Sequence, residues 1–147
     1  MALGAAIAVS VTNPILALPL AFLSHFTLEP LPHWNPHTYT EIKNLGKLST
    51  GTIAIIAIDS LTALFLGSLL AARQLPNIPK ALVVLTACLL AVSPDLIEAP
   101  YYFLKWKNSF LEKTINFQRL IQFDVSPFPG LMTQAVVVLV FAHLAMH

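Results

Sequence analysis

The chain has 147 residues, of which 56% are hydrophobic and only 10% charged, and its mean hydropathy is +0.74. Because an average soluble domain is roughly a quarter charged, this composition excludes an ordinary water-soluble fold and predicts a membrane protein. The net charge of +1 and the lack of a run of Lys or Arg exclude a nucleic-acid-binding surface.

Residues 2–29 form the first hydrophobic segment, which is interrupted at Asn13-Pro14 and at Pro19. Proline removes a backbone donor and clashes with the preceding helical turn. Two arrangements are therefore open. The segment forms either one kinked span, or a short helix that turns at Asn13-Pro14 into a second helix.

The next two hydrophobic segments, 52–72 and 81–102, are long enough to cross ~30 Å of hydrocarbon. Within the later segment, Ser93-Pro94-Asp95 has the order of an N-cap, a proline at the first helical position and an acid in the first turn. We expect this helix to break and restart there.

Residues 103–121 place apolar and aromatic side chains at helical spacing with basic residues between them, a pattern typical of an amphipathic helix in the membrane interface. After breaks at Pro127 and Pro129, residues 130–147 supply the last span. The sequence therefore predicts an all-α fold in one membrane domain, residues 1–147. It is a polytopic membrane helix bundle of about four spans plus an interfacial amphipathic helix.

Successive spans alternate in direction, so the segment ends near residues 29, 52, 102 and 130 are expected on one side of the membrane. At ~1.5 Å rise per residue, polar side chains from different helices come within ~10 Å of that side. These are His25, Asp59, Asp95 and Glu98. Six of the eight Lys and Arg residues lie on the same side, and the positive-inside rule predicts that this side faces the cytoplasm.

His25 and Glu29 are spaced i and i+4, so they share one helix face and both can point at one ion. His33 follows four residues later, but Pro30 and Pro32 end the helix, and the turn must fold His33 back over the helix end. Three nitrogen and oxygen donors with one open position are usual for a catalytic zinc, and this mixture indicates zinc or manganese. The alternative for His25 and Glu29 is an interfacial polar pair that is hydrogen-bonded to lipid headgroups or to each other.

Three acidic residues add to this group. Asp59 lies in a spanning helix, where an acid costs roughly 2.5–3.5 kcal/mol at mid-membrane and indicates function; the alternative is a structural hydrogen bond to another helix. Asp95 and Glu98, spaced i and i+3, are alternatively simple helix-start acids. No basic residue within the spans can pair with these carboxylates, and a divalent metal between them would remove their repulsion.

A histidine motif runs from Ser24-His25-Phe26 through Glu29 to Leu31-Pro32-His33-Trp34. Further positions belong to the same pattern: Gly4-Ala5-Ala6, Asn13-Pro14, Ser93-Pro94-Asp95, Ala99-Pro100-Tyr101-Tyr102, Gly130 and Gln134. Together they resemble a family of small bacterial membrane proteins with a His-x-x-x-Asp-x-x-Pro-His signature, classed as metal-dependent hydrolases. This family is related to the inner-membrane hydrolases described as LexA-binding.

The resemblance implies a bacterial-type inner-membrane protein in which His25, Glu29 and His33 bind a metal ion and Asp95 is a further acid of the metal site. The chain departs from the family pattern in two places. Glu29 stands where Asp is usual, and a histidine common just before the Gly-Ala-Ala stretch has no counterpart.

The leading hypothesis is an intramembrane metal hydrolase that acts on an ester or phosphoester, with Asp59 or Glu98 as general base. A site at headgroup depth would suit a lipid-like substrate drawn from the surrounding bilayer, with the aromatic helix at 103–121 as one wall of its entrance. Two alternatives use the same acids without chemistry. One is an ion- or proton-conducting protein, and the other is a membrane scaffold.

Overall fold

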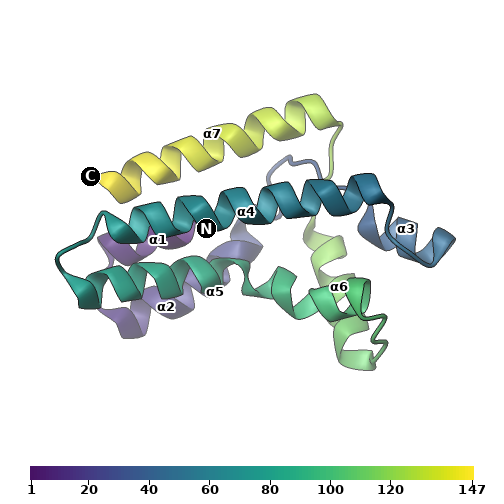
Figure 1. The fold of residues 1–147 in the computed structure, drawn as a ribbon, viewed down its shortest axis with the longest axis horizontal. Helices are drawn as coiled ribbons and strands as arrows, with labels where there is room; N and C mark the ends of the chain where they lie inside the picture. Colours follow the sequence, from purple (N-terminus) through teal and green to yellow (C-terminus); the bar gives the residue numbers. More distant parts are fainter.

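The computed structural model describes residues 1–147 and consists of helices joined by short connections (Figure 1). In chain order they are α1 (Ala2–Ser10), α2 (Pro14–Leu28), α3 (Thr38–Leu45), α4 (Thr50–Ala72), α5 (Ile78–Phe103), α6 (Ser109–Ile121) and α7 (Pro127–Met146). Asn13, Ser49, Asn77 and Asn108 accept hydrogen bonds from the first turns of α2, α4, α5 and α6, which satisfies donors that a helix start leaves free. The predicted all-α fold is confirmed.

Three helices, α4, α5 and α7, are long and apolar enough to cross a membrane, and α2 is a shorter apolar helix. Their outward side chains are large and apolar; Phe65 of α4 is 71% exposed and Leu139 of α7 is 69% exposed. An apolar surface of this extent is unfavourable in water but is solvated by lipid tails. The protein is therefore an integral membrane helix bundle.

The first hydrophobic segment forms two helices, as in the second of the two predicted arrangements. Helix α1 ends at Ser10, Val11 is extended, and the Asn13 side chain accepts a hydrogen bond from Ile15 N at 3.0 Å where α2 begins. Helices α1 and α2 pack against each other. Neither reaches the ~20 residues that a helical span requires.

Small side chains place α1 in the core of the bundle, in contact with α2, α4, α5 and α7. Its buried residues are Ala2, Gly4, Ala5, Ala6 and Ala8. A Cβ added at Gly4 would lie 2.6 Å from the Ala87 carbonyl oxygen of α5, so the two backbones are too close for a larger residue. Close approach through Gly and Ala is common where membrane helices pack.

The predicted break at Ser93-Pro94-Asp95 is wrong, because α5 continues as one helix through Pro94 to Phe103. Pro94 cannot donate to the Leu90 carbonyl, but the Ser93 hydroxyl donates to that oxygen at 2.8 Å. Membrane helices tolerate proline where a neighbouring Ser or Thr satisfies the freed carbonyl. The Ser-Pro pair is thus compatible with an unbroken span.

Other boundaries also differ from the sequence prediction. The amphipathic helix is α6 and is shorter than residues 103–121, because residues 104–108 connect it to α5. Helix α7 begins at Pro127 and not after Pro129, since proline fits the first turn of a helix. Helix α3 has no counterpart in the prediction and ends at Gly46, which adopts the left-handed conformation.

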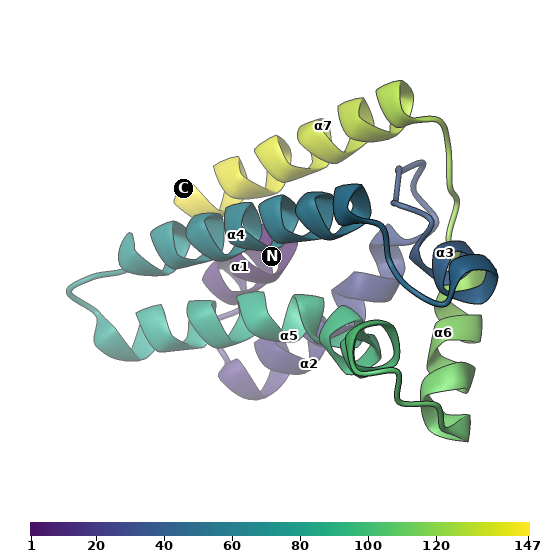
Figure 2. The same ribbon diagram turned by 45° about the vertical axis from the view of Figure 1, so that its right-hand side comes forward.

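One end of the molecule carries α3, α6 and the connections on either side of these two helices. Figure 1 places there the end of α5 and the starts of α4 and α7, with the α4–α5 connection and the C-terminus at the opposite end. Helix α6 runs across the direction of the long helices (Figure 2), as expected for a helix in the membrane interface. This end contains the predicted polar cluster.

The connection from α3 to α4 is held by Glu41. Its carboxylate accepts hydrogen bonds from Ser49 N at 2.8 Å, Ser49 Oγ at 3.1 Å and Thr52 Oγ1 at 2.8 Å. The bond from the Ser49 backbone, more than the others, lowers the pKa of Glu41 below its ordinary value of 4.5. The negative charge of Glu41 therefore stabilises the start of α4.

We expect Glu41→Gln to lower the melting temperature at neutral pH and to have a smaller effect in acid. Because the pKa of Glu41 is lower in the folded chain than in the unfolded chain, its stabilisation is complete above about pH 4.5 and is lost as the pH falls through the folded pKa. Thermal unfolding of both proteins in detergent micelles, measured from about pH 7 down to about pH 3, tests this. A melting-temperature difference that stays constant over this range would contradict it.

Candidate functional site

His25 lies in the last turn of α2 and is only 8% exposed. Its Nδ1 is 3.1 Å from the Ala91 carbonyl oxygen of α5. Since a carbonyl oxygen can only accept, Nδ1 carries the hydrogen, and Nε2 has a lone pair in the neutral ring. Helices α2 and α5 together fix the orientation of this imidazole and the nitrogen that it presents.

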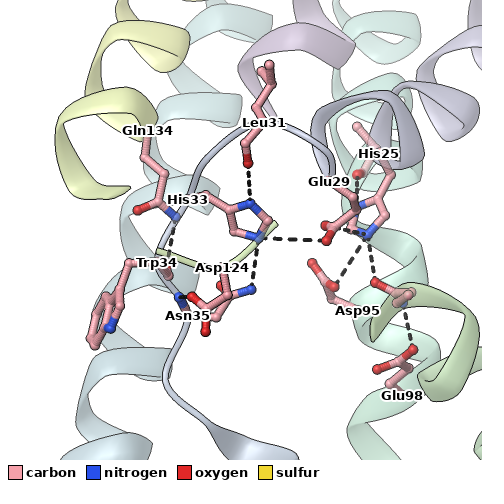
Figure 3. A network of polar contacts seen from close by, with 12 residues as sticks. His25, Glu29, Leu31, His33, Trp34, Asn35, Asp95, Glu98, Asp124 and Gln134 are labelled. Carbon is pink, nitrogen blue, oxygen red and sulfur yellow. Dashed lines mark hydrogen bonds and ion pairs between the residues drawn. The ribbon is translucent and has the colours of Figure 1, made fainter. Parts of the chain in front are cut away.

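Three oxygen atoms surround Nε2 of His25 (Figure 3). Gln118 Oε1 of α6 lies at 3.0 Å, Glu29 Oε1 at 3.5 Å and Asp95 Oδ1 of α5 at 3.6 Å. These oxygens repel the lone pair of a neutral ring nitrogen. A hydrogen donated to Nε2 by one of these carboxyl groups, or a cation bound among the oxygens, would remove this repulsion.

Gln118 connects His25 to Glu98. Its Nε2 donates to Glu98 Oε1 at 2.7 Å, which leaves Gln118 Oε1 for His25. Both Gln118 and Glu98 are buried. The sequence reasoning missed Gln118, although one signal was available: it shares the buried face of α6 with Leu111 and Ile115, and a polar residue on an apolar face needs a partner.

His33, in the loop after α2, reaches the same carboxylate as His25. Its Nδ1 donates to the Leu31 carbonyl at 2.8 Å, and its Nε2 accepts from Asn35 Nδ2 at 3.0 Å. The same Nε2 lies 3.7 Å from Glu29 Oε2. The turn thus folds His33 back over the end of α2 as predicted (Figure 3), and each oxygen of Glu29 faces one imidazole.

The His33 loop is held in place by the segment that precedes α7. Backbone hydrogen bonds join His33 N to Phe123 O at 3.1 Å and Val125 N to His33 O at 3.0 Å, which pairs His33 with Asp124 in a short parallel bridge. The Asp124 carboxylate lies 3.4 Å from His37 Nδ1. His37 is therefore paired with Asp124 and not with Glu29.

Helix α7 supports the same loop. A Cβ added at Gly130 would lie 2.5 Å from Trp34 N and 2.6 Å from Trp34 Cβ. One turn later, Gln134 Nε2 donates to the Trp34 carbonyl at 3.2 Å. One face of α7 thus fixes the backbone directly after His33.

The residues predicted to bind metal form one chain of contacts. In order they are Asp95, His25, Glu29 and His33. Glu98 joins this chain only through Gln118. Asp59 is exposed on α4 and forms no hydrogen bond or ion pair. No Lys or Arg nitrogen lies within 4.0 Å of a carboxylate, so histidines are the only basic side chains that pair with these acids.

The side chains form no ready-made metal site, because no group of three or more His, Cys, Asp or Glu side chains is arranged to hold a metal ion. The three contacts are pairwise, at 3.5, 3.6 and 3.7 Å. Two donors bound at ~2.1 Å to one tetrahedral ion lie ~3.4 Å apart, which is close to these separations. Each imidazole is also held through Nδ1 by a backbone carbonyl, as in metal-binding histidines. Each contact thus has the spacing of two ligands of one ion, but the contacts join the side chains in pairs and do not bring three of them to one point.

Comparison with family models, with curated proteins and with solved structures finds no match to this chain. The resemblance to metal-dependent hydrolases therefore remains a prediction from the sequence, and so do the metal and the reaction. The fold and the contacts around His25 and His33 stand independently of that resemblance.

Proposed function

We propose that the protein is a membrane-embedded metal-dependent hydrolase. Its substrate is an ester or phosphoester, and lipid-like molecules belong to this class. The observation that carries this proposal is Nε2 of His25, which is buried among three oxygen atoms while Nδ1 is held by the Ala91 carbonyl. A divalent cation there turns repulsion into attraction. The residues that would hold it are His25, Glu29, His33 and Asp95.

A bound zinc or manganese ion would lower the pKa of a water molecule toward ~7. The chain positions its own groups for the proton transfer. Glu98 Oε1 is held by Gln118 at 2.7 Å, whereas Glu98 Oε2 forms no hydrogen bond and is free to take the proton. Hydrolysis adds the hydroxyl of water to the acyl or phosphoryl centre, and the proton passes to the leaving oxygen. Because Asp59 forms no hydrogen bond or ion pair with this cluster, we assign the role of general base to Glu98.

We place the site at the cytoplasmic face of a bacterial-type inner membrane, the membrane that the sequence resemblance implies, and the charge distribution supports this orientation. Six of the eight Lys and Arg residues belong to α3, α6 and the connections at the same end of the bundle. They are Lys43, Lys47, Lys105, Lys107, Lys113 and Arg119. By the positive-inside rule, this end faces the cytoplasm.

Metal analysis of the full-length protein, purified in detergent with zinc or manganese added, tests the proposal. We expect about one ion per chain in the unmodified protein and at least about tenfold less in His25→Ala at the same free metal concentration. His143→Ala is the matched control, because His143 lies near the end of α7 at the opposite face. This variant should keep its metal.

Equal and negligible metal in the unmodified protein and in His25→Ala would overturn the proposal. The same four residues would then be candidates for an ion path or for a purely structural cluster. Equal losses in His25→Ala and His143→Ala would also overturn it, because they would indicate metal binding at scattered surface histidines.

A further inference from the structure

An open apolar groove of about 360 Å³ lies between α2, α5 and α6, at the end of the bundle that carries the polar cluster. We call it the aromatic groove. Its lining includes Phe22, Phe26, Pro94, Ile97, Phe117 and Lys113. This volume is at the lower end of the range of ligand pockets, ~300–1,000 Å³.

The aromatic groove lies directly beside the polar cluster. On each of the three helices, a groove residue is the sequence neighbour of a cluster residue. The pairs are Phe26 with His25, Pro94 with Asp95, and Phe117 with Gln118. Neighbouring residues on a helix point about 100° apart, so groove and cluster occupy adjacent faces of the same helices.

A single aromatic ring separates the groove from His25. The Phe26 ring centre is 5.3 Å from the His25 ring centre and 5.7 Å from that of Phe117, and both contacts are edge-to-face. The Phe22 ring also packs edge-to-face against Phe26, with the ring centres 5.6 Å apart. A chain lying in the groove would therefore contact the ring that packs on the imidazole.

The charge at the groove indicates what occupies it. Lys113 is exposed and has no carboxylate within 4.0 Å. The rest of the lining is apolar except for Thr114, whose hydroxyl donates to the Phe110 carbonyl at 3.1 Å. Helix α6, which carries Lys113, lies across the spans in the orientation of an interfacial helix (Figure 2). An occupant that satisfies both features has an apolar chain and an anionic group at headgroup depth.

We propose that the aromatic groove binds one acyl chain of an anionic phospholipid from the surrounding bilayer, while the Lys113 ammonium pairs with the lipid phosphate. Lipid binding at this site depends only on the groove and on Lys113, and not on the proposed hydrolase. Its functional consequence rests on the proposed hydrolase: anionic phospholipids are then the substrate class, because their ester bonds lie near the headgroup, where the polar cluster is.

Native mass spectrometry of the full-length protein in detergent, titrated with dioleoylphosphatidylglycerol or dioleoylphosphatidylcholine, tests the lipid site. We expect the anionic lipid to bind about tenfold more tightly, because the positive choline group of the zwitterionic lipid offsets the attraction between its phosphate and Lys113. Lys113→Gln should abolish this preference. Lys107→Gln, an equal loss of charge in the connection before α6 and outside the groove, should keep it.

A second variant tests the apolar part of the groove. Ile97→Trp places a larger side chain at an exposed position of the groove, and we expect it to weaken the adducts of both lipids. If Ile97→Trp does not fold, the comparison of Lys113→Gln with Lys107→Gln still decides, since both lysines are exposed.

The outcomes separate the lipid site from the hydrolase when bound metal is measured in the same samples. Loss of the lipid preference in Lys113→Gln with metal retained supports the lipid site. Equal binding of the two lipids by the unmodified protein overturns it, and so does an equal loss in Lys107→Gln. A dimer that Ile97→Trp dissociates would also overturn it, because a second copy would then occupy the groove. A lipid site without any bound metal would overturn the hydrolase alone.

Discussion

Replacing Gly4 with leucine is expected to lower the free energy of unfolding by about 3 kcal/mol or more. A single added carbon at Gly4 would already lie 2.6 Å from the Ala87 carbonyl oxygen and 2.9 Å from Ala91 Cβ. Both contacts belong to α5, and backbone atoms cannot rotate away as a side chain can. Helix α1 would have to move out of its position among α2, α4, α5 and α7.

Unfolding in detergent micelles, followed by helical circular dichroism against temperature or sodium dodecyl sulfate, measures this loss. Gly51→Leu is the matched control, because the nearest neighbour of an added Cβ at Gly51 is Ser49 Oγ at 3.9 Å. This control should change stability little. A Gly4→Leu protein as stable as Gly51→Leu would mean that α1 is not packed against α5 as described.

The sequence predicted the fold where hydrophobic length alone decides it. Residues 52–72 correspond to α4 within two residues at its start, because a long apolar run flanked by a cap has one favourable state in a bilayer. The first segment stayed ambiguous, since the same residues suit a kinked span or two helices until their packing is known. Packing of α1 depends on Gly4 and its neighbouring alanines meeting α5, and hydropathy carries no information on that contact.

The error at Pro94 has a different origin. The sequence pattern of a helix start was present, but the pattern omits what Ser93 does for the Leu90 carbonyl. In water, solvent can bind the carbonyl that a proline leaves free, so a broken helix is tolerated. In lipid no water is available, and an unbroken helix in which a nearby Ser binds that carbonyl is more stable. Local motifs therefore mislead most where the solvent differs from water.

The candidate site was predictable in so far as it is local. The spacing of His25, Glu29 and His33 placed three donors on one helix end, and the structure joins them through Glu29. Gln118 is 93 residues from His25 in the chain, and Asp124 meets His33 through a backbone bridge. Neither contact follows from spacing, because both depend on how α6 and the segment before α7 return to this end.

If the chain binds zinc as proposed, Gly130→Ala is expected to weaken that binding by roughly 10–100-fold without unfolding the spans. This is the range seen when a group that orients a metal ligand is disturbed. The added Cβ would lie 2.5 Å from Trp34 N and 2.9 Å from the carbonyl carbon of His33. The loop must then shift away from α7, which moves His33 Nε2 from Glu29 Oε2, now 3.7 Å away. Zinc affinity is measured by competition with a chelator, and helix content by circular dichroism.

A double-mutant cycle tests whether Gly130→Ala lowers zinc affinity by displacing His33. If Gly130→Ala acts by displacing His33, adding it to His33→Ala should cause little further loss of zinc affinity, because the ligand that it displaces is already absent. Losses that multiply in the double variant would show that Gly130 acts elsewhere, and the loop around Trp34 would then not be what positions the second imidazole. Gly51→Ala, at an open position, should bind zinc as the unmodified protein does in either background.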